Sequence, residues 1–281
     1  MDEQGVQQFR AEVTARKNLP TIPAVLARIL QLVDADKANG NELIAVIEHD
    51  QALTAKILRL ANSAFFGQSR RVAAIPRAVV LLGFTTVRNL ALGVKVWDVL
   101  GAGIARSRID ELWAHAVAVG LAIRSLAARL HAGDPDEGFT AGLLHDVGRL
   151  VLAMRFRDEY WRVVGGAGEV QSIHELEAAT FGVDHAEVAG WMLEAWSLPP
   201  TIVDAVRLHH NPGAATGIAG LLAVTDRLVA WTEIGTGATR PEADALLATT
   251  ESQGISPDVW QEVVLRLREG GELASLRRRN V

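Results

Sequence analysis

The sequence predicts an all-α protein, and three observations support that prediction. Apolar residues recur every three or four positions through most of the chain, which is the period of a helix with one buried face. Glycine, proline and short polar side chains stand where helices would begin and end. No stretch alternates apolar and polar residues over the length of a strand, so nothing in the sequence predicts a sheet.

Five helices are expected in the N-terminal part of the chain. Pro23 falls in the first turn of the first helix, where its missing N–H costs nothing. Asn41 is a good N-cap for the second, and Gly83 suits the C-terminal end of the fourth. Their expected ranges, in order, are 22–33, 41–47, 53–60, 78–82 and 85–94.

A connector at about residues 99–108, rich in glycine and small residues, separates these helices from a second helical region. Ser172 with Glu175, and Asp184 with Glu187, have the spacing of a capping box and mark two helix starts. The other helices expected in this region are Ile109–His131, Gly138–Met154, one from Pro199-Pro200 to His209-His210, Gly217–Thr232, and a short charged pair within Pro257–Arg279.

Composition excludes several classes of protein. With 281 residues, of which 49% are hydrophobic, the chain can bury a full core in one large domain or two modest ones. It contains no cysteine, which excludes a disulfide framework, a thiolate zinc site and a cysteine nucleophile. The absence of cysteine also fits a reducing compartment.

The charge distribution argues against nucleic acid as a partner. The net charge is −5, and the basic clusters Arg70-Arg71 and Arg277–Arg279 are more typical of a solvated surface than of a phosphate-binding track. The N-terminus lacks a signal-peptide pattern, and no apolar run reaches the roughly 18 residues of a membrane span. We therefore expect a soluble, cytoplasmic protein without a membrane partner.

The eight histidines are unevenly placed: His49 stands alone, and seven lie between residues 115 and 210. Among them, His145-Asp146 follows two leucines in a helix that is expected to be buried. An isolated buried carboxylate is costly, and a divalent ion held by carboxylate and imidazole removes that cost. A His–Asp hydrogen bond, or a helix end turned to solvent, would explain the same pair without a metal.

Other polar residues leave the same choice open. Glu111 and His115 are four apart, so they can face one ion or form a surface pair. His185 follows a predicted N-cap and is either a ligand or a first-turn residue. His209-His210 ends a helix, where protonated imidazoles also favour the dipole. Asp226 follows an apolar run and is either a ligand, a cap or an ion-pair partner.

The order of these imidazoles and acids along five successive helices resembles the order of metal ligands in the HD superfamily of phosphohydrolases. Several further motifs resemble the HDOD domain, the HD-related output domain. They are Leu19–Pro23, His49–Thr54, Leu58–Gly67, Ile75–Gly83, Gly142–Gly148, Glu177 with Phe181–His185, Trp196–Pro199, and His209–Pro212.

This resemblance implies an HDOD domain over residues 19–232. In it, an N-terminal helical subdomain of about 19–98 would pack on an HD-like bundle of 109–232. Residues 1–18 would form an extension and 233–281 a helical tail. HDOD proteins are bacterial and act in signalling and regulation, often beside cyclic-di-GMP domains. The family is generally regarded as a non-catalytic output module that has commonly lost some metal ligands.

Similarity to the HD-GYP phosphodiesterases implies that this chain keeps a full ligand set for two or more divalent ions. The ions would be iron, manganese or zinc, and Asp146 would bridge them. The set is Glu111, His115, His145, Asp146, His185, His209, His210 and Asp226. Two positions depart from the enzymes. Arg149 replaces a lysine and stays charged where a lysine can titrate. Asn211-Pro212-Gly213 replaces Gly-Tyr-Pro, which weakens the case for a cyclic dinucleotide.

Two functions follow from this resemblance. The first is a regulatory module that retains its metal and binds a signalling partner or a small ligand, such as a nucleotide or phosphate, with a homodimer as one possible state. The second is an active metal-dependent phosphohydrolase or phosphodiesterase. In that case Asp146 would position the nucleophile and Arg149 would neutralise phosphate charge. We expect the first, and catalysis is the alternative.

Overall fold

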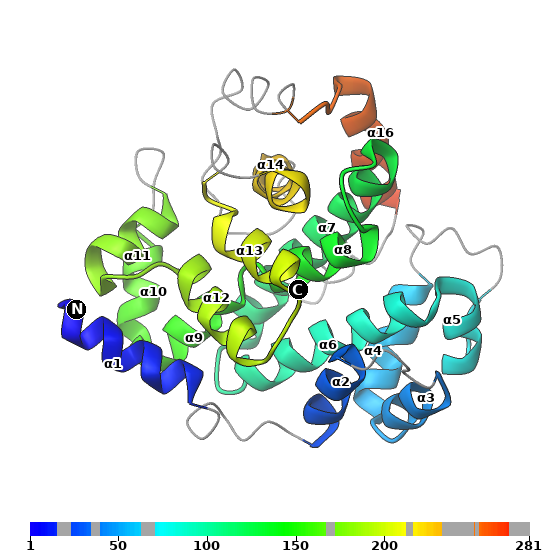
Figure 1. The fold of residues 1–281 in the computed structure, drawn as a ribbon, viewed down its shortest axis with the longest axis horizontal. Helices are drawn as coiled ribbons and strands as arrows, with labels where there is room; N and C mark the ends of the chain where they lie inside the picture. Colours follow the sequence, from blue (N-terminus) through cyan, green and yellow to red (C-terminus); the bar gives the residue numbers. More distant parts are fainter. Residues whose placement is uncertain are drawn as a thin grey trace.

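The computed structural model describes residues 1–15, 24–34, 40–62, 71–166, 172–211, 216–231, 250 and 253–269. Every regular element in these ranges is a helix, so the all-α prediction is confirmed. Some predicted features lie outside the described residues. They are the Leu19–Pro23 motif, residues 63–67 of the Leu58–Gly67 motif, Arg70, Pro212 and the Arg277–Arg279 cluster. Two groups of helices meet along α6 (Phe84–Leu100), as Figure 1 shows.

The first group packs around α6. It consists of α2 (Ala24–Asp34), α3 (Gly40–Glu48), α4 (Gln51–Ala61) and α5 (Ile75–Leu82). Each helix turns an apolar face inward, so that Leu26, Ile47 and Ile57 are fully buried. The other face of α6 contacts the second group, where Trp97 Nε1 donates a hydrogen bond of 2.8 Å to the carbonyl oxygen of Leu143. One hydrophobic core therefore runs through both groups.

The second group is the larger bundle. Its members are α7 (Arg106–Leu130), α8 (Pro135–Leu144), α9 (Val147–Phe156), α10 (Asp158–Val164), α11 (Ile173–Phe181), α12 (His185–Ala195), α13 (Pro200–Leu208) and α14 (Gly217–Trp231). The backbones of α7 and α8 approach closely, since a Cβ on Gly142 would lie 2.5 Å from Gly120 Cα. Only glycine fits at this crossing.

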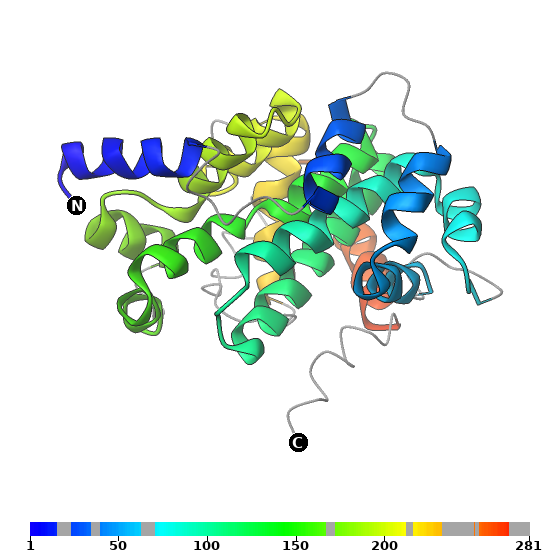
Figure 2. The ribbon, with the colours of Figure 1, turned by 90° about the horizontal axis from the view of Figure 1, so that it is seen from below.

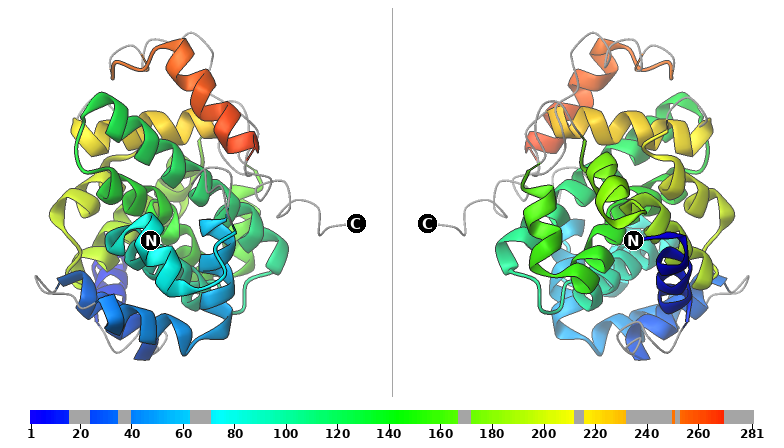
Figure 3. Two further views of the ribbon diagram at one scale, coloured as in Figure 1. Left: turned by 90° about the vertical axis from the view of Figure 1, so that its right-hand side faces the viewer. Right: turned by 90° about the vertical axis from the view of Figure 1, so that its left-hand side faces the viewer.

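Two further helices cover the core from outside, as the views in Figures 2 and 3 show. α1 (Glu3–Thr14) packs on α12, and its Phe9 ring meets the Trp191 ring edge-on at 6.3 Å. α16 (Pro257–Glu269) packs on α7. The sequence pattern did not predict α1, because only Phe9 and Val13 of this helix are buried. Two apolar positions are too few to establish a helical period.

The largest difference from the predicted elements lies at Gly138–Met154. The structure divides this segment into α8 and α9 and starts α8 earlier, at Pro135. The chain turns at His145-Asp146, where Asp146 has φ −96° and ψ 2°. Both side chains of the turn are buried. Hydrophobic period alone cannot show this break, because both helices are buried on all sides.

Some of the predicted helix caps are present in the structure and others are not. Ser172 and Glu175 form the complete capping box. Asp184 caps α12 by accepting from the N–H of Glu187 at 2.9 Å. The Glu187 carboxylate, however, accepts from Trp191 Nε1 at 2.6 Å instead of completing a box. Asn41 lies inside α3, which begins one residue earlier.

α7 is long and apolar enough to span a membrane by length and composition alone. In the structure, 72% of its most apolar 18-residue window is buried. The core helix of a folded domain meets the same criterion, so α7 is best described as the central helix of the bundle.

Candidate metal centre

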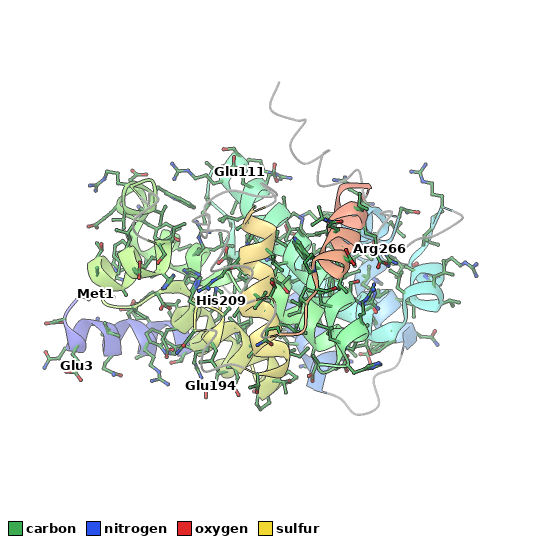
Figure 4. The ribbon with its side chains drawn as sticks, turned by 90° about the horizontal axis from the view of Figure 1, so that it is seen from above. Met1, Glu3, Glu111, Glu194, His209 and Arg266 are labelled. Atoms are coloured by element: carbon green, nitrogen blue, oxygen red, sulfur yellow. The ribbon has the colours of Figure 1, made fainter. Side chains whose placement is uncertain are left out.

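Seven of the predicted ligands come together inside the larger bundle. His115 lies in the middle of α7, and Asp226 lies on the facing side of α14. The remaining five sit at helix ends, namely His145-Asp146 at the α8–α9 turn, His185 as the first residue of α12, and His209-His210 directly after α13. All are buried except His210, which is partly exposed. Figure 4 shows His209 in the interior of the bundle.

The donor atoms form overlapping sets of three, and the atoms of each set lie within 4.8 Å of one another. The sets are His115/His145/Asp146, His145/His209/Asp226 and His185/His209/His210. Two ligands bound to one ion at about 2.0–2.2 Å lie at most about 4.4 Å apart, so small side-chain shifts suffice for each set to hold an ion. His145 and His209 belong to two sets each, so the cluster is continuous and has donors for more than one ion.

His145 and His209 have the orientation that a metal ligand needs. His145 Nδ1 lies 2.8 Å from the carbonyl oxygen of Gly142, and His209 Nδ1 lies 2.6 Å from that of Val206. A carbonyl oxygen only accepts, so each Nδ1 carries a proton and Nε2 is the free ligand atom. Both Nε2 atoms are buried without a hydrogen-bond partner. Burying such an atom unsatisfied is costly, and a metal ion removes the cost.

His185 is held by a carboxylate on the side away from the cluster. Its Nδ1 lies 2.5 Å from Glu177 Oε2, and its backbone N–H donates to the same oxygen at 2.9 Å. Its Nε2 faces Asp146 Oδ1 at 3.1 Å and His210 Nε2 at 2.9 Å. Pairing of the outer ring nitrogen with a carboxylate is typical of histidines that bind metal.

The second carboxylate of the cluster, Asp226, faces two imidazoles. Its Oδ1 lies 2.8 Å from His115 Nε2 and 3.5 Å from His145 Nε2. Asp146 Oδ1 lies 3.7 Å from His145 Nε2 and, as above, close to His185. Asp146 therefore stands between two parts of the cluster, which is the place that a bridging ligand needs.

The buried charges leave room for a divalent cation. In the described part of the chain, the buried side chains other than histidine that carry a charge at neutral pH are the carboxylates of Asp146, Glu177 and Asp226 and the guanidinium of Arg149. With neutral histidines their sum is −3 + 1 = −2, which one divalent ion balances. Without an ion, protons on the histidines must supply the positive charge, because unbalanced charge is costly in the interior.

The pKa values of the histidines follow this electrostatic pattern. Burial lowers the pKa of His145, but Asp146 and Asp226 outweigh burial and raise it. Burial likewise opposes protonation of His185, but Glu177 and Asp146 raise its pKa to about 10. Burial and the neighbouring His145 and His185 lower the pKa of His209 to about 3. His209 is thus neutral at physiological pH, whereas a metal must displace a proton from His185.

The pKa values of both aspartates lie well below the usual range. Burial raises the pKa of Asp146, but His145 and Arg149 outweigh it. The same holds for Asp226 through its hydrogen bond with His115 and the nearby His145 ring. Both carboxylates are therefore ionised over the whole physiological range and are ready to bind a cation.

Metal affinity is expected to rise with pH. The pKa of His185 is raised to about 10, so this residue is protonated near pH 7 in the metal-free protein, and the pKa of His145 is raised as well. Metal binding therefore releases at least about one proton per occupied cluster. Titration calorimetry in buffers of different ionisation enthalpy measures this release. An affinity that stays constant from about pH 6 to 9, with no proton release, would contradict the assignment.

The structure does not bring Glu111 into the cluster. Glu111 is exposed on α7, one turn before His115, and belongs to none of the donor sets. Figure 4 shows it at the outer edge of the molecule, away from His209. A spacing of four places two residues on the same helix face but not at the same depth. The first turns of α7 are largely exposed, so the carboxylate stays near the surface.

The placement of Arg149 does not support its predicted role toward a phosphate. The side chain is buried, with Nη1 3.1 Å from Asp146 Oδ2 and Nε 3.3 Å from the hydroxyl of Tyr160. Both bonds point into the protein. The guanidinium is therefore a neighbour of the ligands, not a free cation in a binding site.

Three residues near the cluster were not predicted as part of it. The Tyr160 hydroxyl donates a hydrogen bond to Glu177, and the His174 ring stacks on the His210 ring with centroids 4.0 Å apart. Glu177 stands eight residues before His185, a separation that gives no helical contact signal because the chain turns between them. Tyr160 is the only tyrosine in the chain. His174 belongs to the group of seven histidines, and that grouping was the available signal.

Comparison with known proteins identifies the class. The model of the HDOD domain family matches residues 19–212, and the chain belongs to this family. An uncharacterized protein of Treponema pallidum is 30% identical over an alignment of 206 residues that covers 69% of this chain and 38% of that protein. This chain therefore spans well under half the length of that relative.

Two crystal structures have the same fold. One is titled "Putative phosphohydrolase" from Shewanella amazonensis, with a TM-score of 0.74 at 24% identity, covering 95% of this chain and 98% of the other. The second is titled "Putative signal transduction protein" from Marinobacter aquaeolei, with a TM-score of 0.73 at 24% identity, covering 97% of this chain and 65% of the other. At this level of identity the likeness shows the HDOD fold.

Proposed function

We propose that the protein is a regulatory signalling module whose HD-like core holds divalent metal and which acts by binding a partner protein or a small ligand. The observation that carries the metal assignment is the pair of buried, unpartnered Nε2 atoms of His145 and His209 beside two ionised aspartates. Iron, manganese and zinc all accept this mixture of imidazole and carboxylate.

Seven residues would hold the metal. They are His115, His145, Asp146, His185, His209, His210 and Asp226. Asp146 would bridge, because its Oδ1 faces both His145 and His185. His210 is the most exposed of the set and, with the His174 ring against it, marks the side from which a ligand would approach.

The observation that favours a binding module over a hydrolase is the position of Arg149. Phosphoryl transfer benefits from a cation beside the phosphate in addition to the metal. Arg149 Nη1 and Nε are bonded to Asp146 and Tyr160, and no other lysine or arginine is buried in the described part of the chain. No second buried cation therefore stands beside the cluster in the described residues to pair with a phosphate.

The second candidate, a metal-dependent phosphohydrolase or phosphodiesterase, is favoured by the near-complete donor set. A bound divalent ion supplies an activated water and polarises phosphate oxygens. Asp146 would then orient the water through its ionised carboxylate.

We further propose a cytoplasmic location, a signalling protein as partner, and no membrane or nucleic-acid partner.

One experiment separates these functions. Metal is measured by inductively coupled plasma mass spectrometry on protein purified without a histidine tag, and hydrolysis of bis-p-nitrophenyl phosphate is assayed with added Mn²⁺ or Fe²⁺. The proposal predicts at least about one equivalent of metal, as expected for donors of this type, and hydrolysis no faster than in an Asp146→Ala control. Hydrolysis that the control loses would establish the enzyme instead. A folded protein without metal would contradict both.

A further inference from the structure

We infer that Arg149, Tyr160 and Glu177 are positioning residues, which close a ring of side-chain contacts with Asp146 and His185 and so fix two metal ligands. The inference rests on the proposed metal site. It assigns a role to three residues, none of which would touch the metal.

The contacts form a closed circuit. Asp146 Oδ2 lies 3.1 Å from Arg149 Nη1, and Arg149 Nε donates to the Tyr160 hydroxyl at 3.3 Å. The Tyr160 hydroxyl donates to Glu177 Oε1 at 2.8 Å. Glu177 Oε2 accepts from His185 Nδ1 at 2.5 Å. His185 Nε2, at 3.1 Å from Asp146 Oδ1, returns to the starting residue.

All five side chains are buried, and they come from several elements. Tyr160 and Glu177 are fully buried, and none of the five exceeds 5% exposure. Asp146 and Arg149 lie at the start of α9, while Tyr160, Glu177 and His185 come from α10, α11 and α12. A buried polar network stabilises one arrangement only if each member is satisfied. The ring meets that condition, and so it joins four parts of the core in one geometry.

Each carboxylate of the ring uses one oxygen for support and leaves a defined atom for the next contact. Arg149 occupies Oδ2 of Asp146, which leaves Oδ1 directed at the histidines. Glu177 holds the proton on His185 Nδ1, which leaves Nε2 as the ligand atom. The ring thus selects which atom of each ligand faces the cluster.

The residue type at position 149 is decisive for this arrangement. The guanidinium carries several N–H groups on a rigid plane, so it can donate to Asp146 and Tyr160 in different directions. A lysine ammonium is a point charge on a flexible chain and would keep the charge without bridging the two. Arg149→Lys therefore tests the bridge, while the charge stays in place.

The test is a Co²⁺ titration of the full chain, followed by the visible absorption spectrum, which reports ligand geometry directly. The ring variants are Glu177→Gln, Tyr160→Phe and Arg149→Lys. The matched controls are Glu175→Gln on the same helix as Glu177, where glutamine still completes the capping box, and Arg155→Lys on the exposed side of α9. Thermal unfolding followed by circular dichroism checks that each variant folds.

The inference predicts that Glu177→Gln raises the Kd for Co²⁺ by about 10–100-fold, and that Tyr160→Phe and Arg149→Lys raise it by about tenfold, with altered spectra in all three. The controls should match the wild type. Tyr160→Phe removes a single oxygen atom, so it decides the matter if another variant does not fold.

The possible failures are distinguishable. If the wild type binds Co²⁺ and the ring variants bind it equally well with the same spectrum, the positioning role is overturned and the metal site stands. If the wild type itself binds no Co²⁺, the proposed function fails and this inference fails with it.

Discussion

Asp146→Ala is expected to eliminate metal binding and to destabilise the metal-free protein. Asp146 is the carboxylate that faces His145 and His185 and the only acid bonded to the buried Arg149 in the described structure. Losing a direct ligand should weaken affinity by more than the roughly 10–100-fold typical of an outer-shell change. The uncompensated guanidinium should cost about 3–5 kcal/mol of folding free energy.

Asp146→Asn separates the two effects. The amide keeps the shape and can still accept a hydrogen bond from Arg149, but it lacks the negative charge. It should lose metal while destabilising the protein less than alanine does. Asp158→Ala, at the start of α10 and away from the cluster, is the control. Metal content and urea unfolding are the measurements, and an Asp146→Ala variant with wild-type metal content would contradict the assignment.

Gly148→Ala is the second change with a large expected effect. A Cβ at this position would lie 1.9 Å from the carbonyl oxygen of His185 and 2.9 Å from the backbone nitrogen of Ala189. Both neighbours are backbone atoms of α12, so α9 and α12 must move apart. Overpacking of this kind typically costs 1–3 kcal/mol and occasionally more, and we expect about 3 kcal/mol here.

Because His185 begins α12 and Asp146 precedes α9, the same displacement must also open the cluster. We therefore expect weaker Co²⁺ binding together with the lower stability in urea. Gly40→Ala is the matched control, since its added Cβ meets nothing nearer than 3.9 Å and should leave stability within about 1 kcal/mol of wild type. Equal stability of both variants would show that α9 and α12 do not pack this closely in solution.

Most of the helices could be predicted from the sequence because their burial is one-sided. α2 to α5 each show the three- and four-residue period, and Ser172 and Gly83 mark real helix boundaries. The helices of the core that are buried all round give no such period, which is why the α8–α9 turn was not predicted. The turn places His145 and Asp146 beside the other donors of the cluster.

The convergence of seven of the eight predicted ligands could be predicted because their order along the chain resembles a known arrangement of metal ligands. Glu111 was included on its spacing from His115 and on the resemblance to the HD-GYP ligand set, and neither reports the depth of a side chain in the bundle. The orientation of Arg149 could not be predicted either, since it depends on Tyr160 from another helix. Glu177 stands with His185 in one of the HDOD motifs, but the motif does not show that its carboxylate contacts the His185 ring across the turn between α11 and α12.

The most direct test of the metal site is a crystal structure of the untagged protein, with anomalous data collected at the manganese, iron and zinc absorption edges. The account predicts an anomalous peak at about 2.0–2.2 Å from the Nε2 atom of His145, of His209 or of both, and at the same distance from other donor atoms of the set concerned. No peak in the cluster, with these side chains in the positions described, would contradict it.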